Sequence, residues 1–237
     1  DLLGASESMR SKLAEYNDPR LSRAFITKQG TSGKEQAPGT ADNAVYAPNG
    51  TPEQGTSKYG TSLFMYSISA PTLLLSYHEL KFLEAEALCR LERDAKSALK
   101  DAVVAGLLNA ENSFTISRKE LGKTLINAAS SITEAEAESY FDNTIEAKYT
   151  AEPLKTTMTQ KYFALWGASG EATESYNDVR RMKGLGENFI ELKNPNSFPL
   201  RCPYGNSDTT TNAEVKAAYG NGQYVYSENV WWAGGSR

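Results

Sequence analysis

The segment from Thr72 to about Leu91 most constrains the fold, because its apolar residues cover two sides of a helix. At about 100° per residue, one face carries Leu73, Tyr77, Leu80, Leu83, Ala87, Leu88 and Leu91. A second stripe carries His78, Phe82, Ala85 and Cys89. The narrow strip left for water holds Glu79, Glu86 and Arg90, and the spacing of the last two favours an i, i+4 ion pair. A helix that is apolar on two sides packs between neighbours, as in stacked helical hairpins.

Further helices follow the same pattern along the chain. Asp94 can cap a partner helix whose apolar positions are Ala98, Leu99, Val103 and Leu107. A first helix is predicted over 6–16 and later ones over 120–127, 134–149, 153–166 and 171–182, with Pro153 in a first helical turn. Two such pairs, about 75 residues apart, resemble tetratricopeptide hairpins, although no strict repeat is visible. The sequence therefore predicts a mostly α-helical fold built on tetratricopeptide-like hairpins.

Two long stretches lack this periodicity. Residues 30–62 are rich in glycine and proline, and a loop of this length in a compact domain is usually functional or disordered. After Lys183 the helical pattern nearly vanishes, apart from a short helix capped by Asn212 and closed by Gly220 within an aromatic tail. We therefore divide residues 1–237 into a helix and turn (1–27), a long loop (28–71), helical hairpins (72–183) and an irregular, loop-rich tail (184–237).

Composition excludes several classes of ligand and partner. With 237 residues and a net charge of −4, the chain shows no basic patch for nucleic acid. No apolar run in the sequence is long enough to span a membrane. Two cysteines and one histidine are too few for a structural zinc site, so we predict neither a metal nor a cofactor. Cys89 and Cys202 are interpreted as buried or idle thiols, with a disulfide between them left open.

No catalytic constellation stands out, so we predict no catalytic residue. Any Ser-His-Asp or Cys-His site would need His78, which lies on an apolar stripe and is interpreted as a core histidine. Glu84 falls in the middle of the first apolar face, where a carboxylate is costly to bury unless it is paired. We expect it to form a buried ion pair with Arg180 or Arg181. A catalytic acid with a raised pKa is the weaker hypothesis for Glu84.

The aromatic residues in and beside the long loop are the candidate binding residues. They are Tyr46, Tyr59, Phe64 and Tyr66, in a polar, glycine-rich segment that offers little core to bury them. Sugars present apolar C–H faces that stack on aromatic rings, and a loop on a rigid helical scaffold is a common arrangement for binding. We therefore predict that these four residues bind glycan. The alternative, in which the rings pack the loop onto the body, is equally open.

Two adjacent tryptophans in the tail, Trp231 and Trp232, need a separate interpretation. Adjacent residues of an extended segment point to opposite sides, so both indoles cannot easily stack on one ligand face. Val230 precedes them and continues the apolar run. We therefore expect at least one of the two indoles to lie in the core.

Several segments together resemble the SusD/RagB family. They are, in chain order, residues 17–21 (Asn-Asp-Pro-Arg-Leu), 76–87, 159–166, 176–181, 198–204, Asn212 and 230–232 (Val-Trp-Trp). Their order and spacing over nearly the whole chain make the combined match specific. By this resemblance, the chain is identified as the C-terminal part of one SusD-like domain.

The resemblance implies a function as well as a fold. Such a protein would bind oligosaccharides at the cell surface without cleaving them and pass them to a SusC-like TonB-dependent transporter. It would be held at the outer membrane by a lipid attached outside this chain. A second hypothesis, from another class, is a tetratricopeptide-type scaffold that binds proteins or peptides. A hydrolase is a third, disfavoured because the sequence offers no catalytic constellation.

Overall fold

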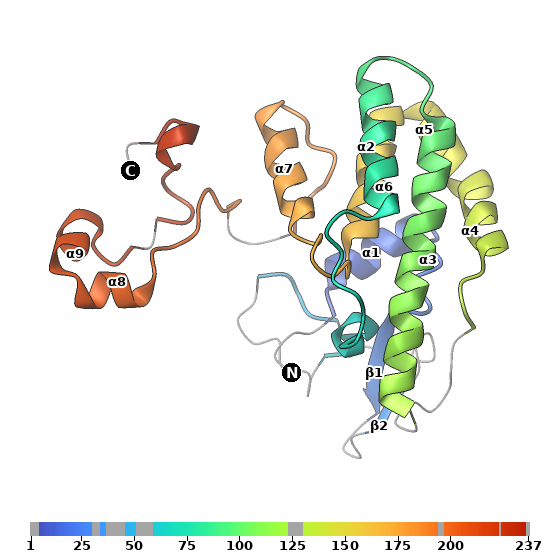
Figure 1. The fold of residues 1–237 in the computed structure, drawn as a ribbon, viewed down its shortest axis with the longest axis horizontal. Helices are drawn as coiled ribbons and strands as arrows, with labels where there is room; N and C mark the ends of the chain where they lie inside the picture. The colour runs from blue at the N-terminus through green and yellow to red at the C-terminus, as the bar shows by residue number, and fades with distance from the viewer. Residues whose placement is uncertain are drawn as a thin grey trace. The chain divides into compact units, whose positions relative to one another are not determined.

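The computed structural model describes residues 5–29, 34–36, 46–50, 59–122, 130–193, 197–222 and 224–235. The chain divides into two compact units, Asp1–Leu192 and Lys193–Arg237. The helices of the first unit are α1 (Glu7–Glu15), α2 (Tyr77–Arg90), α3 (Lys96–Leu121), α4 (Glu134–Tyr140), α5 (Glu146–Ala151), α6 (Pro153–Leu165) and α7 (Glu174–Gly184) (Figure 1). The predicted mostly α-helical fold is confirmed.

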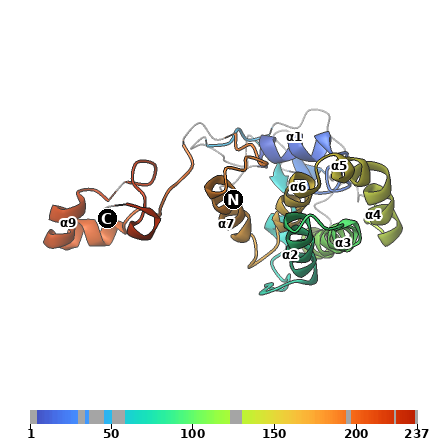
Figure 2. The ribbon, with the colours of Figure 1, turned by 90° about the horizontal axis from the view of Figure 1, so that it is seen from above.

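α2 and α3 form an antiparallel hairpin, and α6 packs against both helices (Figures 1 and 2). α2 begins later than predicted, because the Ser76 side chain accepts a hydrogen bond from the Glu79 backbone N–H and caps the helix there. Before α3 the Asp94 carboxylate accepts from the Lys96 N–H at 3.0 Å, but the N-cap position itself is Ala95, one residue later than predicted. Gly122, with φ of 50°, closes α3. The first two residues of the helix predicted at 120–127 are therefore the end of α3, and residues 123–127 lie outside the described residues.

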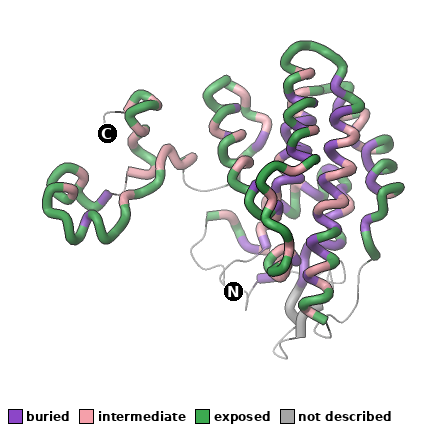
Figure 3. Tube along the Cα trace, in the orientation of Figure 1, coloured by how far each residue is buried: buried purple, intermediate pink, exposed green. Residues whose placement is uncertain are grey.

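The buried side of α2 differs from the prediction. The second stripe faces inward: His78, Phe82 and Ala85 are buried. The face richer in leucine, with Tyr77 and Leu80, is exposed in this chain. The cause is that α3 and α6 both pack on the side of the second stripe, where Cys89 Sγ lies 3.6 Å from Thr157 Oγ1 of α6. Figure 3 shows buried and exposed positions alternating along this hairpin.

A glycine lets α3 and α6 approach closely. A Cβ added at Gly106 of α3 would lie 2.9 Å from the Cβ of Ala164 in α6, closer than two carbons pack. Around this crossing the core is filled by large side chains that are fully buried, among them Phe82, Leu99, Leu107, Phe114 and Phe163. The crossing therefore fixes the spacing of the three central helices.

The predicted helix at 134–149 is continuous in direction but not regular. α4 is followed by a π-helical turn, η4 (Phe141–Ile145), and then by α5. A π-helical turn holds one residue more than an α-helical turn, which shifts the faces on either side of it. Tyr140, Phe141, Ile145 and Tyr149 are all buried. The extra residue thus keeps the apolar side chains of both segments against the core. α6 begins at Pro153 as predicted, and α7 begins at Glu174.

Among the described residues, three short strands form an antiparallel sheet in the order β2-β1-β3. They are β1 (Phe25–Gln29), β2 (Lys34–Gln36) and β3 (Thr61–Ser62), with Phe25 opposite Ser62 and Ile26 opposite Thr61. These strands correct the prediction that 28–71 is an irregular loop. A 3-10 turn, η2 (Leu63–Tyr66), follows β3. Residues 30–33, 37–45 and 51–58 of the predicted loop lie outside the described residues.

The N-terminal segment is fixed to α6 by a buried ion pair. The Asp18 carboxylate accepts hydrogen bonds from Arg20 Nε at 2.8 Å and Nη2 at 2.6 Å. Arg20 Nη1 donates to the Phe163 carbonyl at 2.7 Å, and the Tyr16 ring meets the Phe163 ring edge-on at 5.3 Å. Both charged side chains are buried. The turn after α1, predicted from Asn17-Asp18-Pro19, thus positions a charge pair as well as ending the helix.

The second unit holds α8 (Asn206–Thr211), α9 (Ala213–Tyr219) and a 3-10 turn, η5 (Trp231–Ala233). α9 is capped by Asn212 and closed by Gly220, as predicted, whereas α8 was not predicted. Trp231 and Trp232 are 75% and 63% exposed, so the expectation that one of them lies in the core is wrong. The segment is a 3-10 turn and not extended, so the two side chains do not alternate across a strand.

Cys89 of the first unit and Cys202 of the second are both free thiols in the structure. Within the described part of the chain, no helix combines the length and apolar character needed to cross a membrane.

Candidate ligand-binding site

Two of the four predicted binding residues, Tyr46 and Phe64, belong to one aromatic cluster, which we define as Phe25, Tyr46, Phe64, Phe114 and Trp166. The centroid distances are 5.3 Å for Phe25–Tyr46, 5.3 Å for Phe25–Trp166, 4.8 Å for Phe64–Phe114 and 5.0 Å for Phe64–Trp166. The cluster joins β1, η2, α3 and the end of α6. The structure therefore brings Tyr46 and Phe64 together through Phe25 and Trp166, which the sequence interpretation did not assign to the site.

Backbone geometry holds the cluster in place. Ser62 Oγ accepts from the Phe64 N–H at 3.3 Å, and Ser117 Oγ of α3 donates to the Leu63 carbonyl at 2.6 Å. Gly167 has φ of 79°, and an added Cβ there would lie 2.3 Å from the Phe64 ring. Only glycine fits at this position, because its φ is positive and because a Cβ would clash with the Phe64 ring.

The predicted residues differ in how much ring they offer to a ligand. Tyr46 is half-buried, and the Arg10 guanidinium lies over its ring, 4.9 Å from the centroid. Phe64 and Tyr66 are also half-buried and pack against the core. Tyr59 is only 7% exposed. Tyr46, Phe64 and Tyr66 thus keep part of their surface for a ligand, whereas the position of Tyr59 fits the packing alternative better. The glycan-binding role of all four stays a prediction.

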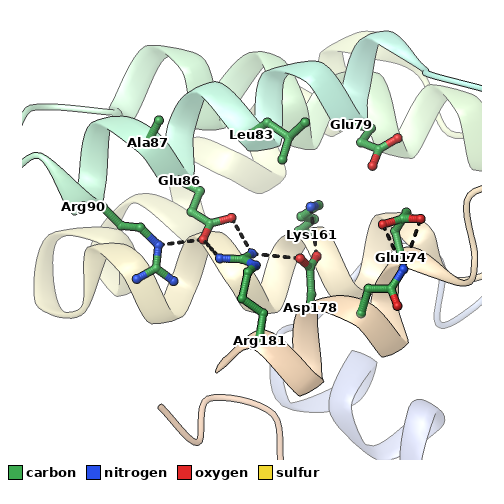
Figure 4. Close-up of a pocket in the computed structure, with 10 residues that line it drawn as sticks. Glu79, Leu83, Glu86, Ala87, Arg90, Lys161, Glu174, Asp178 and Arg181 are labelled. Atoms are coloured by element: carbon green, nitrogen blue, oxygen red, sulfur yellow. Dashed lines mark hydrogen bonds and ion pairs between the residues drawn. The ribbon is translucent and has the colours of Figure 1, made fainter. Parts of the chain in front are cut away.

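A second feature is a pocket of about 560 Å³ between α2, α6 and α7 (Figure 4). Most of its lining is charged, and the side chains form a chain of ion pairs. Its lining residues are Glu79, Leu83, Glu86, Ala87, Arg90, Lys161, Glu174, Asn177, Asp178 and Arg181. Sequence periodicity gave no sign of this pocket, because it forms only when α7 lies beside α2.

Glu86 is the centre of the ion-pair chain. Its Oε1 accepts from Arg90 Nε at 2.7 Å and from Arg181 Nη1, and its Oε2 accepts from Arg181 Nη2 at 2.8 Å. Arg181 Nη2 also donates to Asp178 at 2.8 Å, and Lys161 Nζ lies 2.9 Å from the same carboxylate. The predicted Glu86–Arg90 pair is confirmed. Burial alone would raise the pKa of Glu86, but hydrogen bonds from Arg181 and Arg90 outweigh burial and lower it.

The prediction that Glu84 forms a buried pair with Arg180 or Arg181 is wrong. The Glu84 side chain is 49% exposed and accepts from Lys81 Nζ at 2.9 Å. Because the leucine-rich face of α2 is the exposed one, Glu84 on that face reaches water. Glu86, two residues on, takes the partner that was expected for Glu84.

Glu79, which lines the other end of the pocket, lies beside the buried carboxyl group of Glu171. Glu171 Oε1 accepts from the Ser76 N–H, and Glu171 Oε2 is 3.6 Å from His78 Nε2. Burial, followed by the hydrogen bond and charge of Glu171, raises the pKa of Glu79 to about 7. Burial lowers the pKa of His78 and favours its neutral form. The predicted core position of His78 is confirmed.

The arrangement of these groups suits binding and packing. Charges in the pocket are largely neutralised by one another, and the aromatic cluster offers ring surface without a charged group at its centre. No three of the His, Cys, Asp or Glu side chains in the described ranges are grouped so that they could hold a metal ion.

Comparisons with known proteins agree with this architecture. Residues 2–204 match the sequence profile of the SusD-like family, described as starch-binding associating with outer membrane. A crystal structure of a SusD/RagB family protein from Bacteroides thetaiotaomicron VPI-5482 shares 64% identity with a TM-score of 0.87, covering 99% of this chain and 50% of that one. No curated protein matches the sequence.

Two more distant solved structures share the fold. One is a proposed outer membrane protein with a proposed role in nutrient binding from Bacteroides vulgatus ATCC 8482, at 19% identity and a TM-score of 0.57; 94% of this chain and 50% of that one are covered. The other is a Bacteroidetes SusD-like protein, AC2a, at 19% identity and a TM-score of 0.55, covering 96% and 53%. The chain thus spans about half the length of the solved structures it matches.

Proposed function

This chain belongs to the SusD-like family, and from that membership we propose that it is the C-terminal part of a protein that binds oligosaccharides without cleaving them. The family is described as starch-binding and associated with the outer membrane. The observation that carries the proposal is the match over residues 2–204 together with 64% identity to a SusD/RagB protein over 99% of the chain.

The proposal extends to the cellular setting. The full-length protein would be held at the cell surface by a lipid outside this chain and would pass its ligand to a SusC-like TonB-dependent transporter. Co-purification of the tagged protein with a transporter from detergent-solubilised outer membranes tests the partnership. Recovery of the protein alone, at the detergent concentration that keeps other outer-membrane complexes intact, would count against it.

Within this chain, the partly exposed rings of Tyr46, in the aromatic cluster, and Tyr66, at the end of η2, support a role in the ligand site. Aromatic ring faces stack on the C–H faces of sugars. The cluster is anchored on α3 and α6, so its rings are held in fixed orientations before a ligand arrives. A preorganised surface loses less entropy on binding than a mobile one.

Glycan binding is tested with the full-length protein on a glycan array, followed by calorimetry on each positive oligosaccharide. We expect binding that persists in a metal chelator and without nucleotide, and no release of reducing sugar over long incubation. Turnover that remains constant through successive purification steps would contradict the non-catalytic part of the proposal. Binding to peptides but to no glycan would favour the scaffold hypothesis.

The role of the aromatic residues is tested by single substitutions. Tyr46→Ala and Tyr66→Ala are expected to weaken glycan binding by about 0.5–2 kcal/mol and to leave the melting temperature nearly unchanged. Tyr59→Ala should lower the melting temperature, because its ring is buried. Tyr226→Ala, at an exposed tyrosine of the second unit, serves as the control. If Tyr46→Ala and Tyr66→Ala lose as much stability as Tyr59→Ala, these rings only pack the loop onto the body.

A further inference from the structure

Two buried carboxyl groups meet where the connection between α6 and α7 approaches α2. Glu79 of α2 is 8% exposed, and Glu171 of the connection is 2% exposed. Their side chains are in contact, and because a carboxylate only accepts hydrogen bonds, a hydrogen bond joins them only when one of them carries a proton. Figure 4 shows Glu79 pointing from α2 toward Glu174 of α7, whose charge also acts on Glu79. Glu79 thus faces a carboxyl group on each of two neighbouring segments.

The two oxygens of the Glu171 carboxyl group differ in their hydrogen bonds. Oε1 accepts from the Ser76 N–H at the N-terminal end of α2. Oε2 is buried and has no hydrogen-bond donor among the described residues. His78 Nε2 lies 3.6 Å from it, which is too far for a hydrogen bond, and burial favours the neutral form of that ring. A proton on Glu79 would supply the donor that Glu171 Oε2 lacks.

The cations of the pocket pair mainly with other carboxylates. Lys161 Nζ lies 2.9 Å from Asp178, and Arg181 binds Glu86. The charge of Lys161 lowers the pKa of Glu79, but burial and the contact with Glu171 outweigh it. The titratable and charged groups around the carboxyl pair are His78, Glu86 and Arg90 on α2, Lys161 on α6, Glu174, Asp178 and Arg181 on α7, and Arg20 beyond His78.

The same contact helps to hold α7 against α2. Only two of the 11 side chains of α7 are buried, so polar contacts carry much of its attachment. The ion pairs of Glu86 attach the later turns of α7, whereas the segment before α7 is attached by Glu171 and by the Leu73 N–H, which donates to the Ser169 carbonyl at 2.7 Å.

We propose that Glu79 and Glu171 share one proton, and that this proton is a pH-sensitive latch between α2 and the start of α7. When Glu79 loses the proton to solvent, its carboxylate and those of Glu171 and Glu174 repel one another. The start of α7 then moves away from α2 and widens the pocket between them. This inference does not depend on glycan binding.

Amide hydrogen exchange in the full-length protein measures how often the latch opens. The reporters are the backbone N–H groups of Leu73 and Ser76, which donate across the latch. Glu79→Gln is the reference, because its side-chain amide can donate to Glu171 at any pH. Wild type and variant are compared at the same pH, so the intrinsic pH dependence of exchange cancels. With a pKa of about 7 when the latch is closed and the ordinary value of 4.5 when it is open, opening should rise about tenfold between pH 6 and pH 8.

Two further variants separate a shared proton from a merely structural contact. Glu171→Gln should also remove the tenfold change, because its amide can donate to the ionised carboxylate of Glu79. Glu84→Gln, at an exposed carboxylate of the same helix, is the matched control and should keep the change. The proposal is overturned if wild-type exchange relative to Glu79→Gln is the same at pH 6 and pH 8, or if Glu171→Gln keeps the tenfold change. Exchange at Leu73 and Ser76 that is as slow as in the buried turns of α3 would also overturn it, because opening would then be global unfolding.

Discussion

Replacing Glu86 with Gln removes the negative charge at the centre of the pocket between α2 and α7 and preserves the shape of the side chain. Glu86 is buried and accepts three hydrogen bonds from Arg90 and Arg181. The same helix supplies a matched control, because Glu84 lies two residues away, is exposed and pairs only with Lys81 in the described structure.

The magnitude follows from what each arginine loses. Removing one partner of a buried ion pair costs about 3–5 kcal/mol when the other charge is left uncompensated. Here Arg90 retains Glu187 at 2.8 Å and Arg181 retains Asp178 at 2.8 Å, and both guanidinium groups reach water in part. We therefore expect Glu86→Gln to lower the free energy of unfolding by about 2–3 kcal/mol. Glu84→Gln should lower it by less than about 0.5 kcal/mol, as for other exposed helix pairs.

The assay is urea unfolding at neutral pH, with the same measurement repeated in acid. The pKa of Glu86 is lowered in the folded state, so its contribution is present above the ordinary value of 4.5 and is lost as pH falls through the lowered value. The difference between wild type and Glu86→Gln should therefore shrink in acid. A double-mutant cycle with Arg181→Met isolates the pairwise term.

Two results would refute this reasoning. The first is an equal effect of the substitutions at Glu84 and Glu86, which would mean that burial does not decide the strength of these pairs. The second is a coupling energy of zero between Glu86 and Arg181, which would mean that the contact in Figure 4 contributes nothing to stability.

Three further predictions concern other parts of the chain. The pKa of Glu79 is raised to about 7, so the contribution of Glu79 to stability is complete below pH 4.5, its ordinary pKa, and is lost as the pH rises through 7. The free energy of unfolding, measured between about pH 5 and pH 8, should therefore decline with pH in the wild type and decline less in Glu79→Gln. Gly106→Val should cost about 1–3 kcal/mol through overpacking of the α3–α6 crossing, whereas Gly184→Ala, where nothing lies within 4 Å, should be nearly neutral in thermal unfolding. Trp231→Ala and Trp232→Ala should each leave the melting temperature nearly unchanged, because both rings are exposed in the second unit. A loss of about 3–5 kcal/mol would show that another part of the protein buries them.

Helix positions could be predicted from the sequence because they depend on local signals. The Asn212 cap and the proline that opens α6 are readable within one turn, whereas the Ser76 cap was missed and the start of α2 was placed too early. The orientation of α2 could not be predicted in this way, because both of its sides are apolar and periodicity does not rank them. Which side is buried depends on where α3 and α6 pack, and the position of Glu84 followed from that choice.

The strands and the site were less accessible to sequence reasoning. β2 and β3 have three and two residues, too few for an alternating pattern to stand out. Four aromatic residues in and beside the loop were singled out as candidates, but the burial of Tyr59 depends on its place beside β3, which pairs with a strand more than thirty residues earlier in the chain. Trp166 completes the cluster from the end of α6, and no local pattern links it to the loop.

The contact between the Asp18–Arg20 ion pair and Phe163 of α6 can form only late in synthesis of the chain. Arg20 cannot reach the carbonyl of Phe163 until 143 further residues have been synthesised. The α2–α3 hairpin joins neighbouring segments and can form early, whereas contacts between distant segments form slowly. Until α6 has been synthesised, the Asp18–Arg20 ion pair and the apolar face of α1 therefore stay unburied, and segments of this kind are prone to aggregation. A chain interrupted before α6 would therefore lack the contacts that Tyr16 and Arg20 make with Phe163, and this segment would be more open to proteolysis.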